Sequence, residues 1–391
     1  MRKISAQYIF TSSGKPLKRG VVSVSDDNTI LDVQDTGGNL SESAATEFYN
    51  GIIIPGLVNC HTHLELSHMH DLHPSGDGLA DFVMSVRERR EAEPSEVLAA
   101  AAKADAGMFD DGIVLCGDIS NNALTFNIKR KSQISYITFI EVFGINPSGA
   151  ERRISEAEDV AAAAVAAGLR HHITPHAVYS VSQKLFTLIK QHISPASLSS
   201  LHFLESPDER ELVSHHRGRL AKSYRTFGVT PDNLDTPGSH TETALQLARL
   251  TGQLILVHNT CITADEISTL KNEDNTWFCL CPSSNMRISG TMPPVRLIRS
   301  ASDHIVTGTD SLASTDRLSI LNELRLLQEA APEIHLDEII RWGTINGARA
   351  LNMADSCGSI EPGKKPGLLL IEQADLSSMR LLPGSRVRRL L

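Results

Sequence analysis

Short apolar runs alternate with amphipathic or alanine-rich stretches through most of this chain of 391 residues. Apolar runs bounded by polar, Gly or Pro positions predict buried strands, whereas apolar residues spaced three and four apart predict helices. The predicted strands cover residues 51–63, 112–121, 134–144, 171–180, 199–206, 253–260, 276–285 and 303–311. The predicted helices cover residues 79–89, 96–109, 155–168, 182–192, 240–251, 263–271 and 318–330. Eight strands alternating with helices predict an α/β protein with a (β/α)₈ TIM barrel; an open doubly wound sheet is the alternative.

The two ends of the chain have a different pattern. Residues 1–55 contain short stretches with alternating apolar positions, broken by Gly, Asn and Asp, and residues 355–391 are strand-like again. The simplest assembly joins both ends into one small β-sandwich domain and leaves residues 56–354 for the barrel domain. The segment 208–238 is polar and gives no clear helix or strand signal.

Composition narrows the functions open to this chain. Lys plus Arg is 37 and Asp plus Glu is 46, so the net charge is −9. An acidic chain without a basic run argues against nucleic acid or an anionic membrane as the main partner, and a small-molecule substrate is expected instead. The cysteines form no Cys-x-x-Cys pair, and the N-terminus lacks the apolar run of a signal peptide. Since no apolar stretch reaches the ~18 residues of a membrane span, a cytoplasmic protein is expected.

Polar residues that could carry chemistry follow the predicted strands. His61 and His63, two apart at the end of the first buried run, point to the same side of a strand. The other candidates at strand ends are Glu141, His176, His202, Glu205, His258, Asn285 and Asp310. The C-terminal ends of barrel strands form one rim, so a barrel would bring these side chains together. Each alone has a plainer explanation, such as a helix cap for Asp310, but five histidines with two or three carboxylates at one rim favour a site.

The residue types predict the chemistry of such a site. Imidazole and carboxylate ligands without a thiolate suit one divalent metal, Zn²⁺ in preference to Fe²⁺ or Mn²⁺. A metal held by three histidines and one carboxylate lowers the pKa of a bound water towards ~7. Hydrolysis also needs a proton shuttle, for which Glu205 is the candidate. Asp310 could orient the water, and His258 could polarise the electrophile.

Five segments together resemble the amidohydrolase superfamily. They are PGLVNCHTHLE (55–65), HFLES (202–206), VHN (257–259), CPSSN (281–285) and GTDS (308–311), in the order expected for that superfamily. The closing segment GSIEPGKKPGLLLI (358–371) is also similar, except that Pro366-Gly367 stands where an Asp is common. The spacing His202-x-x-Glu205, with CPSSN and GTDS, resembles the deaminase and chlorohydrolase branch.

The resemblance implies an enzyme, a hydrolase of carbon–nitrogen bonds other than peptide bonds, of the cyclic amidine deaminase type. It implies metal binding by four residues, which are His61, His63, His202 and Asp310. It further implies Glu205 as the proton shuttle, with His258 and Asp310 orienting or activating the attacking water. Members with two metals use a carboxylated Lys after the fourth strand, which HHITPHAVYS (171–180) lacks, so a single metal is expected.

A narrower likeness is to the aminofutalosine deaminases of menaquinone biosynthesis. It is carried by HTHLELS (61–67), CPSSN and the GTDSLAS…LSILNEL pattern (308–324). It implies that the 6-amino group of an adenine-type nucleoside is replaced by oxygen with release of ammonia. The residues expected to contact substrate are His176, Glu141, Asn285 and an arginine, Arg87 or Arg287, for the substrate carboxylate. The plainer explanation of Arg87 is a solvated helix face.

Three functions stay open from the sequence. The first is deamination of an adenine-type nucleoside, with S-adenosylhomocysteine, methylthioadenosine or guanine as alternative substrates. The second keeps the metal and changes the bond, to dehalogenation or cyclic amide hydrolysis. The third is an inactive scaffold or binding protein, against which the metal and proton-shuttle candidates both argue. Since amidohydrolases often form dimers, a homodimer is an expectation from the resemblance alone.

Overall fold

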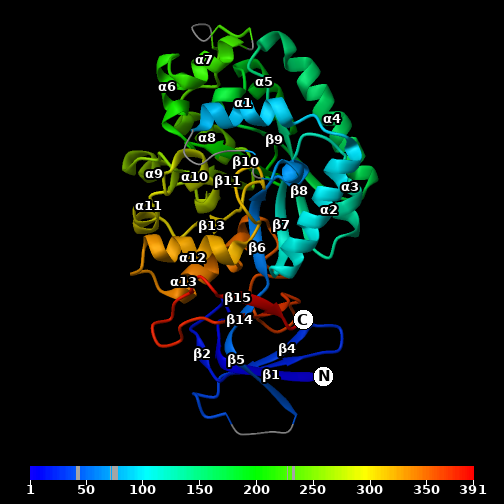
Figure 1. The fold of residues 1–391 in the computed structure, drawn as a ribbon, viewed down its shortest axis with the longest axis vertical. Coiled ribbons are helices and arrows are strands. Elements are labelled where there is room, and N and C mark those ends of the chain that lie inside the picture. Colours follow the sequence, from blue (N-terminus) through cyan, green and yellow to red (C-terminus); the bar gives the residue numbers. More distant parts are fainter. Residues whose placement is uncertain (41–44, 71, 73–77, 227, 231–233) are drawn as a thin grey trace.

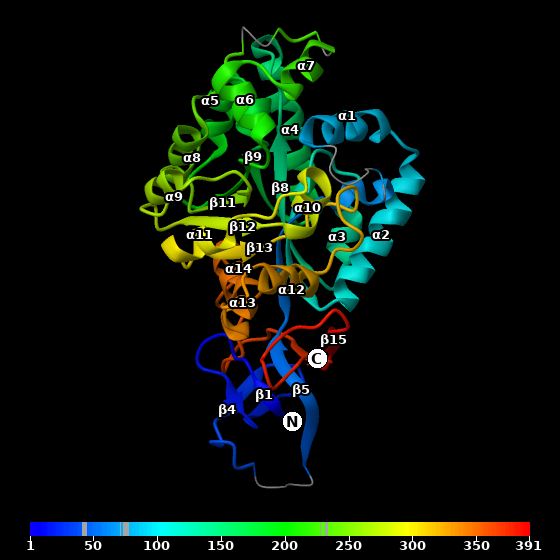
Figure 2. The ribbon, with the colours of Figure 1, turned by 60° about the vertical axis from the view of Figure 1, so that its left-hand side comes forward.

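A large α/β barrel and a small β domain make up the molecule, and both chain termini lie in the small domain (Figures 1 and 2). The computed structural model describes residues 1–40, 45–70, 72, 78–226, 228–230 and 234–391. The chain starts in the small domain, passes through the whole barrel and returns to the small domain at its end.

Eight strands follow one another around the barrel in chain order. They are β6 (Leu57–Thr62), β7 (Ile113–Ser120), β8 (Ser135–Val142), β9 (Arg170–Pro175), β10 (Leu198–Phe203), β11 (Gln253–His258), β12 (Thr276–Leu280) and β13 (Ile305–Thr307). They pair in parallel as two sheets, β6-β7-β8-β9 and β10-β11-β12-β13. Parallel bridges join the sheets at both seams, from Ala177 to His202 and from Thr62 to Asp310. The predicted fold class, a (β/α)₈ barrel, is confirmed.

The two seams of the barrel are closed by residues of the predicted site. The backbone N–H of His202 donates to the carbonyl oxygen of His176 at 2.8 Å. At the other seam, the N–H of Asp310 donates to the carbonyl oxygen of His61 at 3.0 Å. Closing the barrel therefore also brings the first, fifth and last strands together at one rim.

Helices and short helical turns lie outside the strands (Figure 2). The helices are α1 (Leu79–Arg89), α2 (Pro94–Asp110), α3 (Phe126–Lys131), α4 (Ala150–Ala166), α5 (Gln183–Ile189), α6 (Pro207–His215), α7 (Arg219–Thr226), α8 (His240–Ala248), α9 (Ala264–Leu270), α10 (Pro282–Ser289), α11 (Val295–Ala301), α12 (Ile320–Ala330), α13 (Leu336–Trp342) and α14 (Ile345–Ala350). The 3₁₀ turns are η1 (Leu64–Met69), η2 (Pro147–Gly149), η3 (Val178–Ser180) and η4 (Lys190–His192). Within the described ranges, no helix combines the length and apolar character needed to cross a membrane.

The seventh predicted strand is too long. Residues 276–285 were expected to be one strand, but β12 ends at Leu280 and α10 begins at Pro282. Proline suits the first position of a helix, because its fixed φ is already helical and its missing N–H would have no partner there. Asn285 therefore lies on a helix and not at a strand end. The polar segment 208–238 contains the short helices α6 and α7.

Strands from both termini form one sheet in the small domain. They are β1 (Arg2–Ile9), β2 (Leu17–Lys18), β3 (Val21–Val24), β4 (Ile30–Gln34), β5 (Thr46–Pro55), β14 (Leu368–Glu372) and β15 (Arg386–Arg389). The order is β15-β14-β5-β1-β3-β4, with β2 paired to β1. The small β domain from both termini is thus found, with its described strands in one hydrogen-bonded sheet rather than the two sheets of a sandwich. The domain boundaries at residues 55 and 355 stay a prediction.

The apolar run before His61 serves both domains. Ile53 belongs to the core of the small domain, whereas Ile52 and Ile54 pack into the barrel core. Gly56 separates β5 from β6 where the chain passes very close to its neighbours. A Cβ there would lie 2.4 Å from Cγ1 of Val114 and 2.5 Å from the carbonyl oxygen of Pro366. Only glycine fits this crossing without a shift of the surrounding atoms.

Candidate active site

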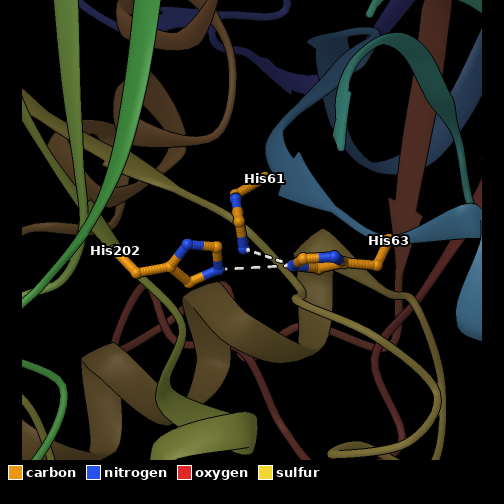
Figure 3. A group of neighbouring side chains, drawn as sticks. All are labelled: His61, His63 and His202. Atoms are coloured by element: carbon orange, nitrogen blue, oxygen red, sulfur yellow. Dashed lines mark hydrogen bonds between the residues drawn. The ribbon is translucent and has the colours of Figure 1, made fainter. Parts of the chain in front are cut away.

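Three histidine side chains converge at the C-terminal rim of the barrel (Figure 3). His61 lies in β6, His63 directly follows that strand and His202 lies in β10; all three are buried. Nε2 of His63 lies 3.2 Å from Nε2 of His61 and 3.3 Å from Nε2 of His202. The two-residue spacing at the end of β6 thus places both imidazoles on the same side, as the sequence predicts.

The spacing of the three nitrogens fits a tetrahedral metal site. Ligands at a Zn–N distance of about 2.0–2.1 Å lie about 3.3–3.4 Å apart at the corners of a tetrahedron. Burial lowers the pKa of His61 and lowers that of His63 to about 3, so both rings are neutral and can offer a lone pair. Among the described residues, the three histidines form one of two groups of potential ligands whose binding atoms lie within 4.8 Å of one another.

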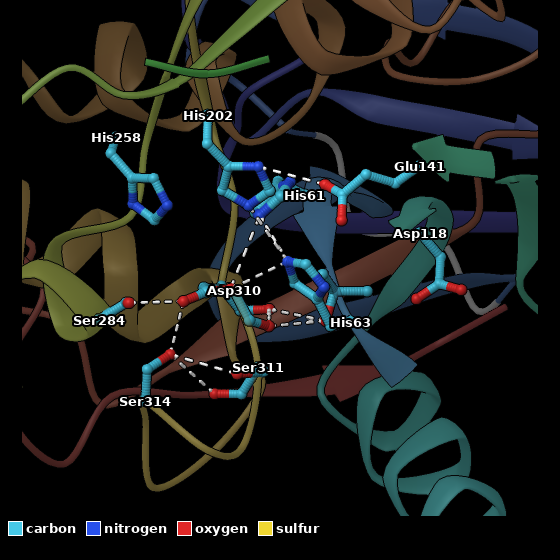
Figure 4. A network of polar contacts seen from close by, with 12 residues as sticks. His61, His63, Asp118, Glu141, His202, His258, Ser284, Asp310, Ser311 and Ser314 are labelled. Carbon is cyan, nitrogen blue, oxygen red and sulfur yellow. Dashed lines mark hydrogen bonds and ion pairs between the residues drawn. The ribbon is translucent and has the colours of Figure 1, made fainter. Parts of the chain in front are cut away.

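Asp310 faces the same three histidines from the turn after β13 (Figure 4). Its Oδ1 lies 3.6 Å from Nε2 of His61 and 3.4 Å from Nε2 of His63. Its Oδ2 accepts hydrogen bonds from the hydroxyl groups of Ser284, at 2.7 Å, and Ser314, at 2.6 Å. Burial alone would raise the pKa of Asp310, but the hydrogen bond with His61 and the neighbouring imidazoles hold it well below its usual range. One carboxylate oxygen therefore faces the histidines while two hydroxyls fix the other.

The second ring nitrogen of His202 contacts acceptors on the opposite side. Its Nδ1 lies 3.3 Å from Oε1 of Glu141 and 3.1 Å from the carbonyl oxygen of His176. Burial would lower the pKa of His202, but the hydrogen bond and charge of Glu141 raise it to about 9. Both acceptors hold a proton on Nδ1 and direct Nε2 towards the other histidines, as a carboxylate does behind a metal-binding histidine. At this pKa the ring also carries a proton on Nε2 at neutral pH, which a metal bound there would displace. Glu141, His176 and His202 are the second ligand group found among the described residues.

Glu205 and His258 lie beside the histidines, where β10 and β11 end. Oε1 of Glu205 is 3.7 Å from Nε2 of His258, and both side chains are buried. Burial raises the pKa of Glu205 to about 8 and lowers the pKa of His258 well below its usual value. At neutral pH the carboxyl group therefore holds its proton and the imidazole is neutral. A buried carboxyl group whose pKa is near the working pH suits proton transfer.

The turns at these strand ends have unusual backbone angles. Four residues that are not glycine have left-handed φ values: Leu204 (51°), His258 (78°), Asn259 (58°) and Asp310 (58°). Such conformations cost of order 1–3 kcal/mol each and persist only where the surroundings hold them. Here the N–H of Asn259 donates to the carbonyl oxygen of Phe203 at 3.0 Å. The strained turns direct the polar side chains towards one rim of the barrel.

The site opens into a cavity of about 750 Å³. The predicted site residues that line it are His63, Arg87, Glu141, His176, His202, Glu205, His258 and Asp310. His61 lies fully buried next to them. Asn285 and Arg287 are not among the lining residues of the described chain: the Asn285 amide contacts Nδ1 of His258 at 3.1 Å, and Arg287 pairs with Asp316. The structure gives no support to substrate contact by either residue.

Among the cavity residues that the sequence does not predict are Phe143, Arg90 and Arg153. The guanidinium carbons of Arg90 and Arg153 lie 5.8 and 5.5 Å from the centre of the Phe143 ring. Arg90 directly follows α1 and Arg153 lies in the first turn of α4, positions at which a charged residue ordinarily faces water. Arg90 donates to the buried carboxyl group of Glu65 at 2.8 Å. Glu65 lies just after the His-x-His segment, and this position was the one sequence feature that could have pointed to Arg90.

Both the sequence and the fold are similar to known proteins. Residues 52–383 match the sequence model of the amidohydrolase family. An adenosine deaminase from Helicobacter pylori is 28% identical over 331 residues, which cover 82% of this chain and 79% of that protein. An aminodeoxyfutalosine deaminase from Nitratiruptor sp. is 26% identical over 358 residues, which cover 88% and 85% of the two chains.

A solved structure has the same fold. It is Helicobacter pylori aminofutalosine deaminase in complex with methylthio-coformycin, which is 22% identical to this chain. The two structures agree with a TM-score of 0.79 over 98% of this chain and 94% of the other. The family match spans most of the chain and includes every residue of the histidine and carboxylate cluster. This chain therefore belongs to the amidohydrolase family and is a hydrolase that acts on carbon–nitrogen bonds.

Proposed function

We propose that this protein is a metal-dependent hydrolytic deaminase of an adenine-type nucleoside. In this proposal His61, His63 and His202 hold one divalent metal, Zn²⁺, together with Asp310. The observation that carries the proposal is the 3.2 and 3.3 Å spacing of the Nε2 atoms, which matches the edge of a tetrahedral zinc site. The ligand atoms are imidazole nitrogen and carboxylate oxygen, which suit Zn²⁺ in preference to Fe²⁺ or Mn²⁺.

A metal bound there supplies a Lewis acid and lowers the pKa of a coordinated water. The reaction adds water to the ring carbon that bears the amino group and releases ammonia, so one ring nitrogen must gain a proton. Glu205 is the proton donor, because burial keeps its carboxyl group protonated at neutral pH. His258 lies 3.7 Å from Glu205 and is neutral, so its Nε2 can bind an oxygen or nitrogen at the reacting carbon.

The cavity supports a substrate that carries an anionic group away from the reacting ring. From His202 the wall continues through His176, at 4.5 Å between ring centres, to Phe143, at 6.1 Å from His176. Arg90 and Arg153 both lie against the Phe143 ring. Guanidinium groups bind carboxylates with paired, charge-assisted hydrogen bonds. The arginines therefore lie one aromatic ring beyond His176 along this wall of the cavity.

Arg153 is a further candidate for this role beside Arg87, because both line the cavity, whereas Arg287 does not. One N–H group of Arg153 donates to Glu156 at 3.0 Å, and a guanidinium has five N–H groups to share. The substrate we propose is aminofutalosine or its deoxy form, which carries a carboxylate and belongs to menaquinone biosynthesis. The similarity to an aminodeoxyfutalosine deaminase supports this choice, and the arginines support it over the uncharged methylthioadenosine.

The test compares substrates with and without the carboxylate. Zinc-loaded protein is assayed for ammonia release from aminodeoxyfutalosine, S-adenosylhomocysteine, methylthioadenosine and adenosine. Arg153→Met should lower kcat/KM for aminodeoxyfutalosine about tenfold or more, since a hydrogen bond to a charged group is worth about 1.5–3 kcal/mol. The same variant should leave kcat/KM for methylthioadenosine unchanged.

Arg152→Met is the matched control, because Arg152 lies on the same helix and is exposed. An equal loss for charged and uncharged substrates would overturn the arginine site. Ammonia release from an uncharged nucleoside alone would keep the deaminase and change its substrate. Absence of ammonia from the whole panel, with zinc bound, would overturn the proposed reaction and favour cyclic amide hydrolysis.

A further inference from the structure

Helix α10 touches the site through two neighbouring side chains. Ser284 donates to Oδ2 of Asp310, as Figure 4 shows, and Asn285 contacts Nδ1 of His258 at 3.1 Å. Both are fully buried, and the backbone N–H of Asn285 is held by the carbonyl oxygen of Cys281 at 3.0 Å. The helix thus presents the Ser284 hydroxyl to Asp310, which follows β13, and the Asn285 amide to His258, which ends β11.

The orientation of the Asn285 amide indicates which nitrogen of His258 carries hydrogen. The atom that faces Nδ1 of His258 is Nδ2 of Asn285, an amide NH₂ group that can only donate. In this orientation Nδ1 accepts, and in a neutral ring the single hydrogen then lies on Nε2. Nε2 is the atom 3.7 Å from Glu205, and His258 lines the cavity. The amide therefore makes His258 a hydrogen-bond donor towards the reaction site.

Glu323 holds the start of α10. The residue before this helix, Cys281, makes no side-chain cap hydrogen bond. Instead the fully buried carboxylate of Glu323, on α12, accepts the N–H of Ser283 at 2.9 Å. Asn322, its neighbour on α12, donates to the Ser283 hydroxyl at 3.2 Å. Burial raises the pKa of Glu323 to about 7, and a carboxyl oxygen can accept the Ser283 N–H in either protonation state, so the contact fixes the helix relative to α12.

We propose that Asn285 is a positioning residue that keeps the hydrogen of His258 on Nε2, and that Glu323 positions the helix that carries Asn285. This inference rests on the proposed function for its kinetic consequence alone. The assignment of the ring hydrogen is a property of the protein and can be measured without substrate. It also replaces the substrate contact expected of Asn285 from the sequence with a contact to a second protein side chain.

The direct test is NMR of zinc-loaded protein with ¹⁵N-labelled histidine. Two-bond ¹H–¹⁵N correlations identify the ring nitrogen that carries hydrogen, and His258→Gln assigns the signal. We expect hydrogen on Nε2 of His258 in the unmodified protein and in Asn272→Leu, a control at an exposed asparagine. Asn285→Leu, similar in volume but without a donor, should give a mixture of both forms. Hydrogen on Nδ1 in the unmodified protein, or an unchanged signal in Asn285→Leu, would overturn the proposal.

Kinetics supply the second readout. Asn285→Leu should lower kcat about 10- to 100-fold with little change in KM or metal content, as outer partners of site histidines do. Glu323→Leu should show the same split, and Glu323→Gln, which keeps an oxygen for the Ser283 N–H, should restore it. Glu329→Gln, at an exposed position of α12, is the control. A similar loss in Glu323→Gln and Glu323→Leu would contradict the role of the acceptor.

The two proposals can fail separately. An unmodified protein that releases no ammonia while hydrogen lies on Nε2 of His258 would refute the proposed reaction and keep the positioning role. Normal deamination by a protein with hydrogen on Nδ1 of His258 would refute the positioning role and keep the proposed reaction. If Glu323→Leu does not fold, Asn285→Leu still tests the assignment.

Discussion

Replacing Glu205 by Gln tests the proton transfer with the smallest change of shape. Glutamine has nearly the same volume and keeps an oxygen and a hydrogen-bond donor, but it cannot give up a proton to a ring nitrogen. Glu205 is buried, and its Oε1 lies 3.7 Å from Nε2 of His258, which is not one of the three clustered histidines. The variant should therefore fold, bind metal as before and lose turnover.

The size of the loss follows from the state of the carboxyl group. With a pKa of about 8, about nine-tenths of Glu205 is protonated at pH 7. General acid catalysis by a positioned group is worth about 10²- to 10⁴-fold, or about 2.7–5.4 kcal/mol at 1.36 kcal/mol per tenfold. We expect kcat of Glu205→Gln to fall within this range.

The assay measures ammonia release at saturating nucleoside, with metal content determined on the same sample. The acid form of Glu205 exists below its pKa and is lost above it. Activity of the unmodified enzyme should therefore fall as pH rises through about 8. This alkaline decline should be absent from the residual activity of Glu205→Gln. Full activity of the variant with its metal bound would refute the role of Glu205 as proton donor.

Three further substitutions test the metal site and the framework around it. His202→Ala should leave the purified protein largely without metal by elemental analysis, and a normal metal content would remove His202 from the ligands. Lys129→Met leaves the fully buried carboxylate of Asp118 without its cation, so the free energy of unfolding should fall by about 3–5 kcal/mol in urea titration; a change below about 1 kcal/mol would contradict this. Gly56→Ala places a Cβ 2.4 Å from a neighbouring atom and should destabilise by about 1–3 kcal/mol. Gly14→Ala, with no atom within 4 Å, should not, and equal effects would refute the steric argument.

The barrel and its histidines could be predicted from the sequence because both rest on local periodicity. The run before His61 is apolar over several residues, and His61 and His63 stand two apart, so strand geometry alone places them together. His202, Glu205, His258 and Asp310 each follow an apolar run, and a closed barrel brings such ends to one rim. These predictions needed the order of strands and not the details of packing.

The rest depended on contacts between segments that are distant in sequence. Pro282 allowed a helix start as well as a strand end, and only the packing of α10 against α12 decides between them. Arg90 and Arg153 lie on helical segments with no motif, and they reach the cavity because Phe143 packs against both. The contact of Asn285 with His258 joins residues 27 positions apart, so no spacing rule could show it.

The most direct measurement of the central claim is ammonia release with the metal removed and restored. Purified protein is assayed against the nucleoside panel as isolated, after chelation, and after addition of Zn²⁺. We expect at least one 6-aminopurine nucleoside to yield ammonia in equal amount to the oxygen-containing product. We also expect chelation to abolish this activity and zinc to restore it. Zinc-loaded protein that releases no ammonia from any member, or activity that chelation leaves intact, would contradict the account.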